Sequence, residues 1–114
     1  MKIRFIEPGN RPYKPTILNY FVYDRYIRTP SVGLNTLATI VKREYPDTYM
    51  YSESISKIPM KDLQDANIIF ISIFTYAAVR GYQIATYLKE HTNATIVMGG
   101  LHASMNVKEA VNYC

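Results

Sequence analysis

The chain has 114 residues, 48% of them hydrophobic and 19% charged, and a formal net charge of +4. This length predicts a single domain with a core of its own, and the composition argues against disorder. No apolar run reaches the roughly 18–20 residues needed to span a membrane, and MKIRFIEP at the start reads as a strand and not as a signal peptide. The one cysteine, Cys114, has no intramolecular partner, so we expect a cytoplasmic protein.

The excess positive charge lies in the first thirty residues. Against Glu7 and Asp24, this stretch contains Lys2, Arg4, Arg11, Lys14, Arg25 and Arg28. Scattered cations without a basic helix disfavour nucleic acid as a partner. Attraction of an anionic small molecule, or solubility alone, accounts for the charge better.

Strand and helix patterns alternate along the chain. Residues 2–6 predict a strand, and residues 11–30 a tyrosine-rich loop of about twenty residues, a length that is usually functional. Residues 31–45 predict a helix with Ser31 as its cap. Its expected inward face consists of Leu34, Leu37, Ala38, Val41 and Tyr45.

The second half continues the alternation. Residues 48–53 predict a strand, residues 57–66 a short helix or turn, and the apolar run 67–74 a central strand covered on both faces. A helix over about 76–90 and a strand over 94–98 follow. The helix should turn inward Ala77, Gly81, Ile84, Ala85 and Leu88. A capping box of Asn106 and Glu109 predicts a last helix with Val107, Ala110 and Val111 inward.

This order of elements predicts an α/β, Rossmann-like or flavodoxin-like domain of three layers, with a parallel sheet in strand order 2-1-3-4. Open parallel sheets bind ligands outside the carboxyl ends of their strands. Those ends are expected at residues 7–10, 72–76 and 99–104, so the unusual residues of the chain should meet at one edge.

Six residues at this edge are candidate ligand contacts. Gly99 and Gly100 can form a shelf that a ligand approaches closely, or they can serve only a tight turn. The hydroxyl groups of Ser72, Thr75 and Tyr76 can bind amide or phosphate oxygens, although Thr75 can instead cap a helix. No metal ligands lie at suitable spacing near His102, so we interpret it as a hydrogen-bonding residue of the edge. We identify no catalytic residue and no metal ligand.

Four segments resemble a known family. MKIRFIEP, TPSVGLNTLATIVKREYP, DANIIFISIFTYAAVRGYQIATYLKE and IVMGGLHASMNVKEAVNY occur in an order similar to that of the N-terminal cobalamin-binding domain of B12-dependent radical SAM enzymes, a group of Fe–S oxidoreductases. The resemblance covers nearly all of residues 1–114. It implies that cobalamin lies at the strand carboxyl ends, with its nucleotide tail near Ser72, Thr75, Gly99 and Gly100 and with His102 nearby. Classical B12 domains carry D-x-H-x-x-G after the first strand; here EPGNRPYKP has no histidine, so the resemblance implies cobalamin without a protein histidine ligand.

The resemblance also implies which parts of such an enzyme would lie outside residues 1–114. The C-x-x-x-C-x-x-C motif of radical SAM barrels is absent, so the [4Fe–4S] cluster and S-adenosylmethionine would belong to a downstream domain, the main partner of this one, and the chain alone should not be catalytic. The parent would be an oxidoreductase or a methyltransferase. The family's fifth strand is missing, which leaves residues 94–98 as an apolar sheet edge and predicts a homodimer. The alternative function is a domain of this fold that has lost the ligand and contacts substrate or a partner.

Overall fold

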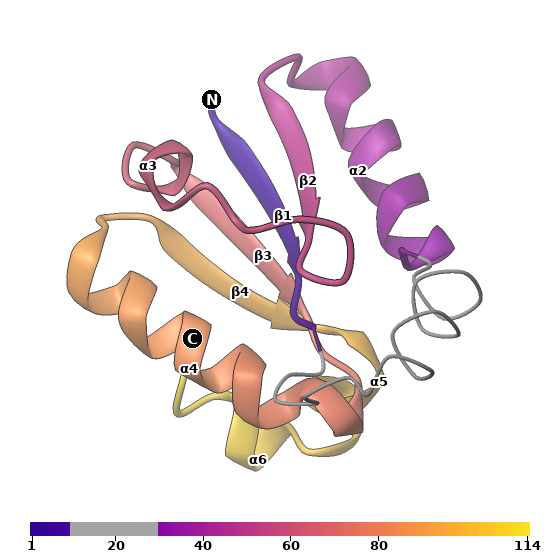
Figure 1. Ribbon diagram of the computed structural model, residues 1–114, viewed down its shortest axis with the longest axis vertical. Coiled ribbons are helices and arrows are strands. Elements are labelled where there is room, and N and C mark those ends of the chain that lie inside the picture. The colour runs from indigo at the N-terminus through magenta and orange to yellow at the C-terminus, as the bar shows by residue number, and fades with distance from the viewer. Residues whose placement is uncertain (10–29) are drawn as a thin grey trace, which may run out of the picture.

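The computed structural model describes residues 1–9 and 30–114. Its centre is a four-stranded, all-parallel sheet in the order β2-β1-β3-β4 (Figure 1). The strands are β1 (Ile3–Glu7), β2 (Thr48–Ser52), β3 (Ile68–Ser72) and β4 (Thr95–Gly99). The predicted parallel sheet and its strand order are confirmed. The predicted tyrosine-rich loop, residues 11–30, lies outside the described residues except for Pro30.

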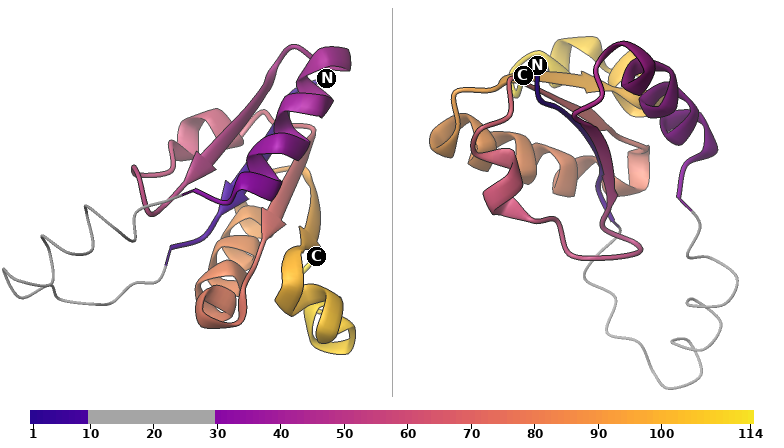
Figure 2. Two further views of the ribbon diagram at one scale, coloured as in Figure 1. Left: turned by 90° about the vertical axis from the view of Figure 1, so that its right-hand side faces the viewer. Right: turned by 90° about the horizontal axis from the view of Figure 1, so that it is seen from above.

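Helices cover both faces of this sheet and complete three layers (Figure 2). Helix α2 packs on one face, α3 and α4 pack on the other, and α5 and α6 follow the end of β4. The bounds are α2 (Val32–Glu44), α3 (Met60–Leu63), the 3-10 turn η2 (Thr75–Ala77), α4 (Ala78–His91), α5 (Gly100–Met105) and α6 (Val107–Ala110). The predicted α/β class is therefore confirmed.

Two hydrophobic clusters form because successive side chains of a strand point to opposite faces. The larger cluster joins alternate β3 residues to α4, and all five predicted inward residues of α4 and the preceding turn are buried. The smaller cluster lies under α2, where Phe5 and Phe70, register partners on β1 and β3, stack with ring centroids 4.8 Å apart.

Helix α2 begins and ends as predicted but buries a narrower face. The Ser31 hydroxyl accepts from the backbone N–H of Leu34, as an N-cap should, and the helix stops before Pro46. Leu34 and Ala38 are buried, whereas Leu37 is 47% and Tyr45 41% exposed. The prediction that these last two face inward is wrong, because α2 covers only part of its side of the sheet.

The structure corrects the predicted last helix. A six-residue helix, α5, starts directly at Gly100, and Asn106 does not cap α6 with its side chain. The Asn106 amide instead donates to the carbonyl of His102 at 3.2 Å. Of the three residues predicted to face inward, Ala110 is buried but Val107 and Val111 are more than half exposed. The helical turn is too short to bury a full face.

A buried arginine holds the amino-terminal half of the sheet together. Arg4, 2% exposed, contacts Asp47 before β2 and Asp62 in α3, and Lys2 also pairs with Asp62. The hydrogen bond from Arg4 lowers the pKa of Asp62 well below its usual range, and bonds from Tyr51 and Lys2 add to this. Two of the six basic residues in the N-terminal excess are therefore paired with carboxylates and do not form an open cationic surface.

Candidate functional site

The carboxyl ends of β3 and β4 meet as the sequence predicts. Ser72 ends β3 and Gly99 ends β4, and the two are register partners. The pairing continues one step further, because the N–H of Ile73 donates to the Gly99 carbonyl and the N–H of His102 donates to the Ile73 carbonyl. This edge therefore brings the start of α5 directly against the end of β3.

The two adjacent glycines have different physical roles. Gly100 has φ +88°, and a Cβ there would lie 2.7 Å from the carbonyl oxygen and 2.8 Å from the nitrogen of Ile73. Gly99 has an ordinary extended backbone, and a Cβ on it would meet nothing within 4 Å. Gly100 is thus required by the turn itself, whereas Gly99 borders open space.

That open space belongs to a groove between α2 and the sheet, which we call the α2 groove. It has a volume of about 320 Å³. Its lining is Phe5, Ser31, Gly33, Leu34, Leu37, Phe70, Ile71, Ser72, Phe74, Val97, Gly99 and Gly100. Three of the six predicted contact residues, Ser72, Gly99 and Gly100, line it together. The walls are aromatic and aliphatic, so the groove is suited to a flat apolar group with a hydroxyl at its edge.

A buried carboxylate stands at the end of β1, near the start of α2. Glu7 is 6% exposed, and its Oε1 accepts from the backbone N–H of Ser31 at 2.9 Å. A carboxylate is stabilised at a helix N-terminus by the free N–H groups and the helix dipole. Glu7 therefore fixes the helix end that forms one wall of the α2 groove.

The other three predicted residues lie elsewhere. Thr75 and His102 line a second groove, along α4 on the opposite face of the sheet, which we call the α4 groove. Tyr76 is 64% exposed, stacks parallel to Phe74 at 5.8 Å, and is in neither lining. The structure thus separates the predicted set into two sites.

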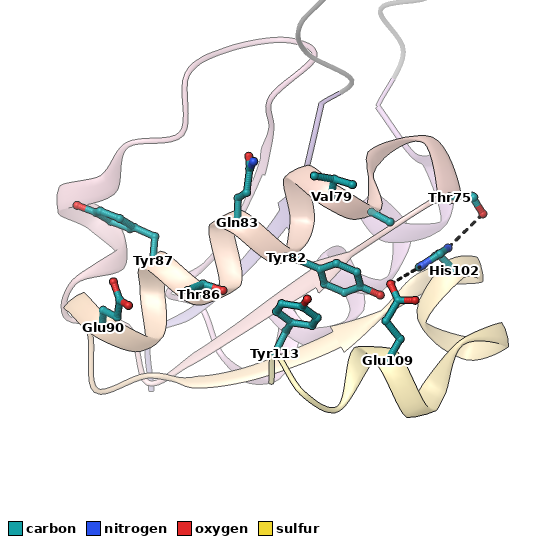
Figure 3. A pocket seen from close by; sticks show the side chains of 11 residues that line it. Thr75, Val79, Tyr82, Gln83, Thr86, Tyr87, Glu90, His102, Glu109 and Tyr113 are labelled. Carbon is teal, nitrogen blue, oxygen red and sulfur yellow. Dashed lines mark hydrogen bonds and ion pairs between the residues drawn. The ribbon is translucent and has the colours of Figure 1, made fainter.

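The α4 groove has a volume of about 730 Å³ and runs between α4 and α5–α6 (Figure 3). His102, 9% exposed, is its most enclosed titratable side chain apart from Tyr82. Its Nδ1 lies 3.3 Å from the Thr75 hydroxyl, and its Nε2 lies 3.5 Å from Glu109 Oε1. Neither η2 nor α4 has a side-chain cap, so the alternative role of Thr75 as a helix cap is wrong.

Sequence reasoning missed the residues that surround His102. Tyr82 and Tyr113 stack with centroids 4.0 Å apart and interplanar angle 13°, and Glu109 completes the group (Figure 3). Tyr82 lies four residues after Ala78 on the flank of the apolar face of α4, a spacing that could have indicated it. Nothing in the sequence indicated Tyr113, because its position depends on the path of α5 and α6.

Within the described residues, no helix is long and apolar enough to cross a membrane. The same part of the chain contains no cluster of three His, Cys, Asp or Glu side chains that could hold a metal ion. Comparison of the chain with protein-family models, with curated proteins and with solved structures gave no match.

Proposed function

We propose that this chain is a cobalamin-binding module of the type that precedes the barrel of B12-dependent radical SAM enzymes. The observation that supports this most is the α2 groove, at the carboxyl edge of a parallel sheet, where Ser72, Gly99 and Gly100 meet. Such edges are the usual ligand sites of open α/β sheets.

The residues of the α2 groove fit part of the cofactor. Its volume lies at the lower end of the roughly 300–1,000 Å³ of small-molecule pockets, so it suits the flat nucleotide base of cobalamin and not the whole molecule. Phe5 and Phe70 supply an aromatic floor, Ser72 a hydroxyl, and Gly99 an unobstructed side. The larger part of the cofactor would remain outside the groove.

Neither histidine of the chain is placed to bind cobalt from this groove. His102 faces the α4 groove, and His91 stacks on Tyr87 at the end of α4. We therefore propose that cobalamin is bound without a protein imidazole. The radical chemistry, with its [4Fe–4S] cluster and S-adenosylmethionine, would belong to a partner domain, and we propose a cytoplasmic location.

The test is retention of hydroxocobalamin by the purified protein, measured as its visible absorbance after desalting and as a saturable change in its spectrum. Gly99→Leu should abolish retention, because its side chain fills the open side of the α2 groove. Thr86→Leu adds an apolar side chain on the exposed surface of the α4 groove and should retain the cofactor. Absence of binding by the unmodified protein, or equal binding by the Gly99→Leu variant, contradicts the proposal.

A second candidate is an interaction domain of the same fold that binds no cofactor. It is favoured by the apolar side chains exposed on α2 and α5, since Leu37, Ile40 and Leu101 are 47%, 54% and 58% exposed. In this case no cobalamin would be retained. The apolar side chains exposed on α2 and α5 would instead contact a protein domain, and Ile40→Lys would weaken that contact without changing the fold.

A further inference from the structure

The α4 groove contains two buried polar atoms without a hydrogen-bond partner among the described residues. These are Nε2 of His102 and the hydroxyl of Tyr82, each with less than 1 Å² accessible. Both residues are at least nine-tenths buried, at 9% and 8% exposed, and their rings meet edge to face with centroids 6.1 Å apart. Buried polar groups are nearly always paired in folded proteins, so this pair indicates an absent ligand.

The neighbours of His102 favour one of its two neutral tautomers. Nδ1 lies 3.5 Å from Nδ2 of Asn106 and 3.3 Å from the Thr75 hydroxyl. The Asn106 amide nitrogen can only donate and the Thr75 hydroxyl can donate as well, so of the two neutral tautomers the one with its proton on Nε2 suits both neighbours. His102 therefore presents an N–H beside the O–H of Tyr82.

The Glu109 carboxylate approaches both donors, and in this geometry it completes a hydrogen bond with neither. Its Oε1 is 3.5 Å from Nε2, beyond the 2.7–3.2 Å of an N–H···O hydrogen bond, and its side chain is 53% exposed. Burial and the nearby Glu109 carboxylate raise the pKa of Tyr82 to about 12, so the phenol keeps its proton at neutral pH. The end of the groove thus consists of two donors next to one acceptor (Figure 3).

We propose that the α4 groove binds a flat apolar molecule through an amide or lactam edge. Its carbonyl oxygen accepts from His102 and Tyr82, and its adjacent N–H donates to Glu109, which turns outward to admit it. Ala78, Val79 and the stacked ring of Tyr113 provide the apolar wall.

The charges of the groove disfavour carboxylates and amines, the two ligand classes related to amides. Glu90 and Glu109 line the groove, and no lysine or arginine is among the described residues that line it. A carboxylate ligand would meet these like charges, and an amine would leave both buried donors unpaired. This site is independent of the proposed cobalamin site, which lies on the other face of the sheet.

The test compares benzamide, benzoate and benzylamine, which share one ring and differ in the polar group. Each is titrated into the ¹⁵N-labelled protein, and backbone amide shifts are followed. Benzamide should shift resonances of α4, α5 and α6 in a saturable manner and bind at least tenfold more tightly than the other two. Tyr82→Phe should raise the dissociation constant of benzamide about fivefold, which corresponds to the loss of one neutral hydrogen bond.

Two variants serve as controls. Tyr45→Phe makes the same chemical change on an exposed ring at the end of α2, outside the α4 groove, and should bind benzamide as the unmodified protein does. Glu109→Gln removes the charge that repels benzoate, so the affinity for benzoate should come to within about threefold of the affinity for benzamide. Tyr82→Phe should unfold no more easily than the unmodified protein, because the hydroxyl has no partner to lose.

Three results would overturn the proposal: no saturation by benzamide, equal binding of the three probes, or benzamide binding unaffected by Tyr82→Phe. If Glu109 turns inward in solution and satisfies both donors itself, Tyr82→Phe will destabilise the fold and benzamide will not bind, which also refutes it. Cobalamin retention is read separately, so failure of either site is distinguishable from failure of the other.

Discussion

Replacing each of the two adjacent glycines with alanine should have opposite effects on stability. The methyl group added at Gly100 points into the backbone of Ile73, whereas the one added at Gly99 points into the open α2 groove. The two substitutions are chemically identical and one residue apart. Any difference between them therefore reports local geometry alone.

The structure sets the size of the difference. At Gly100 the backbone is left-handed, φ +88°, which costs alanine about 1–2 kcal/mol. The approach of 2.7 Å to the Ile73 carbonyl oxygen forces a shift of backbone, and overpacking of this kind costs about 1–3 kcal/mol. Gly100→Ala should therefore lower the free energy of unfolding by about 2–5 kcal/mol. At Gly99 the backbone is extended, and alanine should be neutral or stabilise by about 0.4–1 kcal/mol.

Urea unfolding followed by far-ultraviolet circular dichroism measures both values, with a common slope required for the comparison. Gly100→Asn separates the two contributions, because asparagine tolerates the left-handed region but still carries a Cβ. It should lie between alanine and glycine. Equal stability of Gly99→Ala and Gly100→Ala would refute the distinction between the two glycines.

Three further predictions concern the core and the sheet edge. Because the fold lowers the pKa of Asp62, the stability that Asp62 contributes is complete above its unfolded pKa of about 3.9 and is lost as the pH falls below that value. Asp62→Asn removes a charged partner of Arg4 and should lower the free energy of unfolding by about 1.5–3 kcal/mol at pH 7. The same substitution should reduce the loss of stability at acidic pH in a plot of stability against pH. Gly81→Ala should destabilise by about 1–3 kcal/mol in thermal unfolding, because its Cβ would lie 2.3 Å from an isoleucine methyl group, whereas Gly33→Ala, which meets only a hydroxyl at 4.0 Å, should not. If the β4 edge pairs two chains, light scattering will give the mass of a dimer, and Val97→Lys will restore that of a monomer.

The sheet could be predicted from the sequence because β3, one of its two central strands, is strongly apolar; in the structure it is buried on the α4 face and half-buried on the α2 face. Residues 67–74 are apolar except for Asn67 and Ser72, a pattern typical of a central parallel strand in a chain of alternating elements. Helix α2 was predictable at both ends, since Ser31 and Pro46 fix its limits locally. The turn after β4 was not, because α5 depends on the bond from the His102 N–H to the Ile73 carbonyl, two residues that lie far apart in the sequence.

The sequence predicts at which end of the sheet the candidate site residues lie, but not on which face of the sheet each of them lies. That Ser72 and Gly99 meet follows from parallel strands ending together. That His102 lies apart from them, beside Tyr82, does not, because it depends on how the first turn of α5 is directed. Spacing along the chain indicates which end of a sheet a residue occupies, and only packing determines the side.

The two grooves share one structural element, the turn at Gly100, and this makes their independence testable. Gly100 lines the α2 groove, and two residues later the chain places His102 in the α4 groove. A side chain at Gly100 displaces Ile73, whose carbonyl holds His102, so it should disturb both grooves at once. Changes at Gly99 and Tyr82 should each affect one groove alone. Joint loss of both ligands in a Gly100 variant would therefore report damage to the turn, and only the separate variants assign a ligand to a groove.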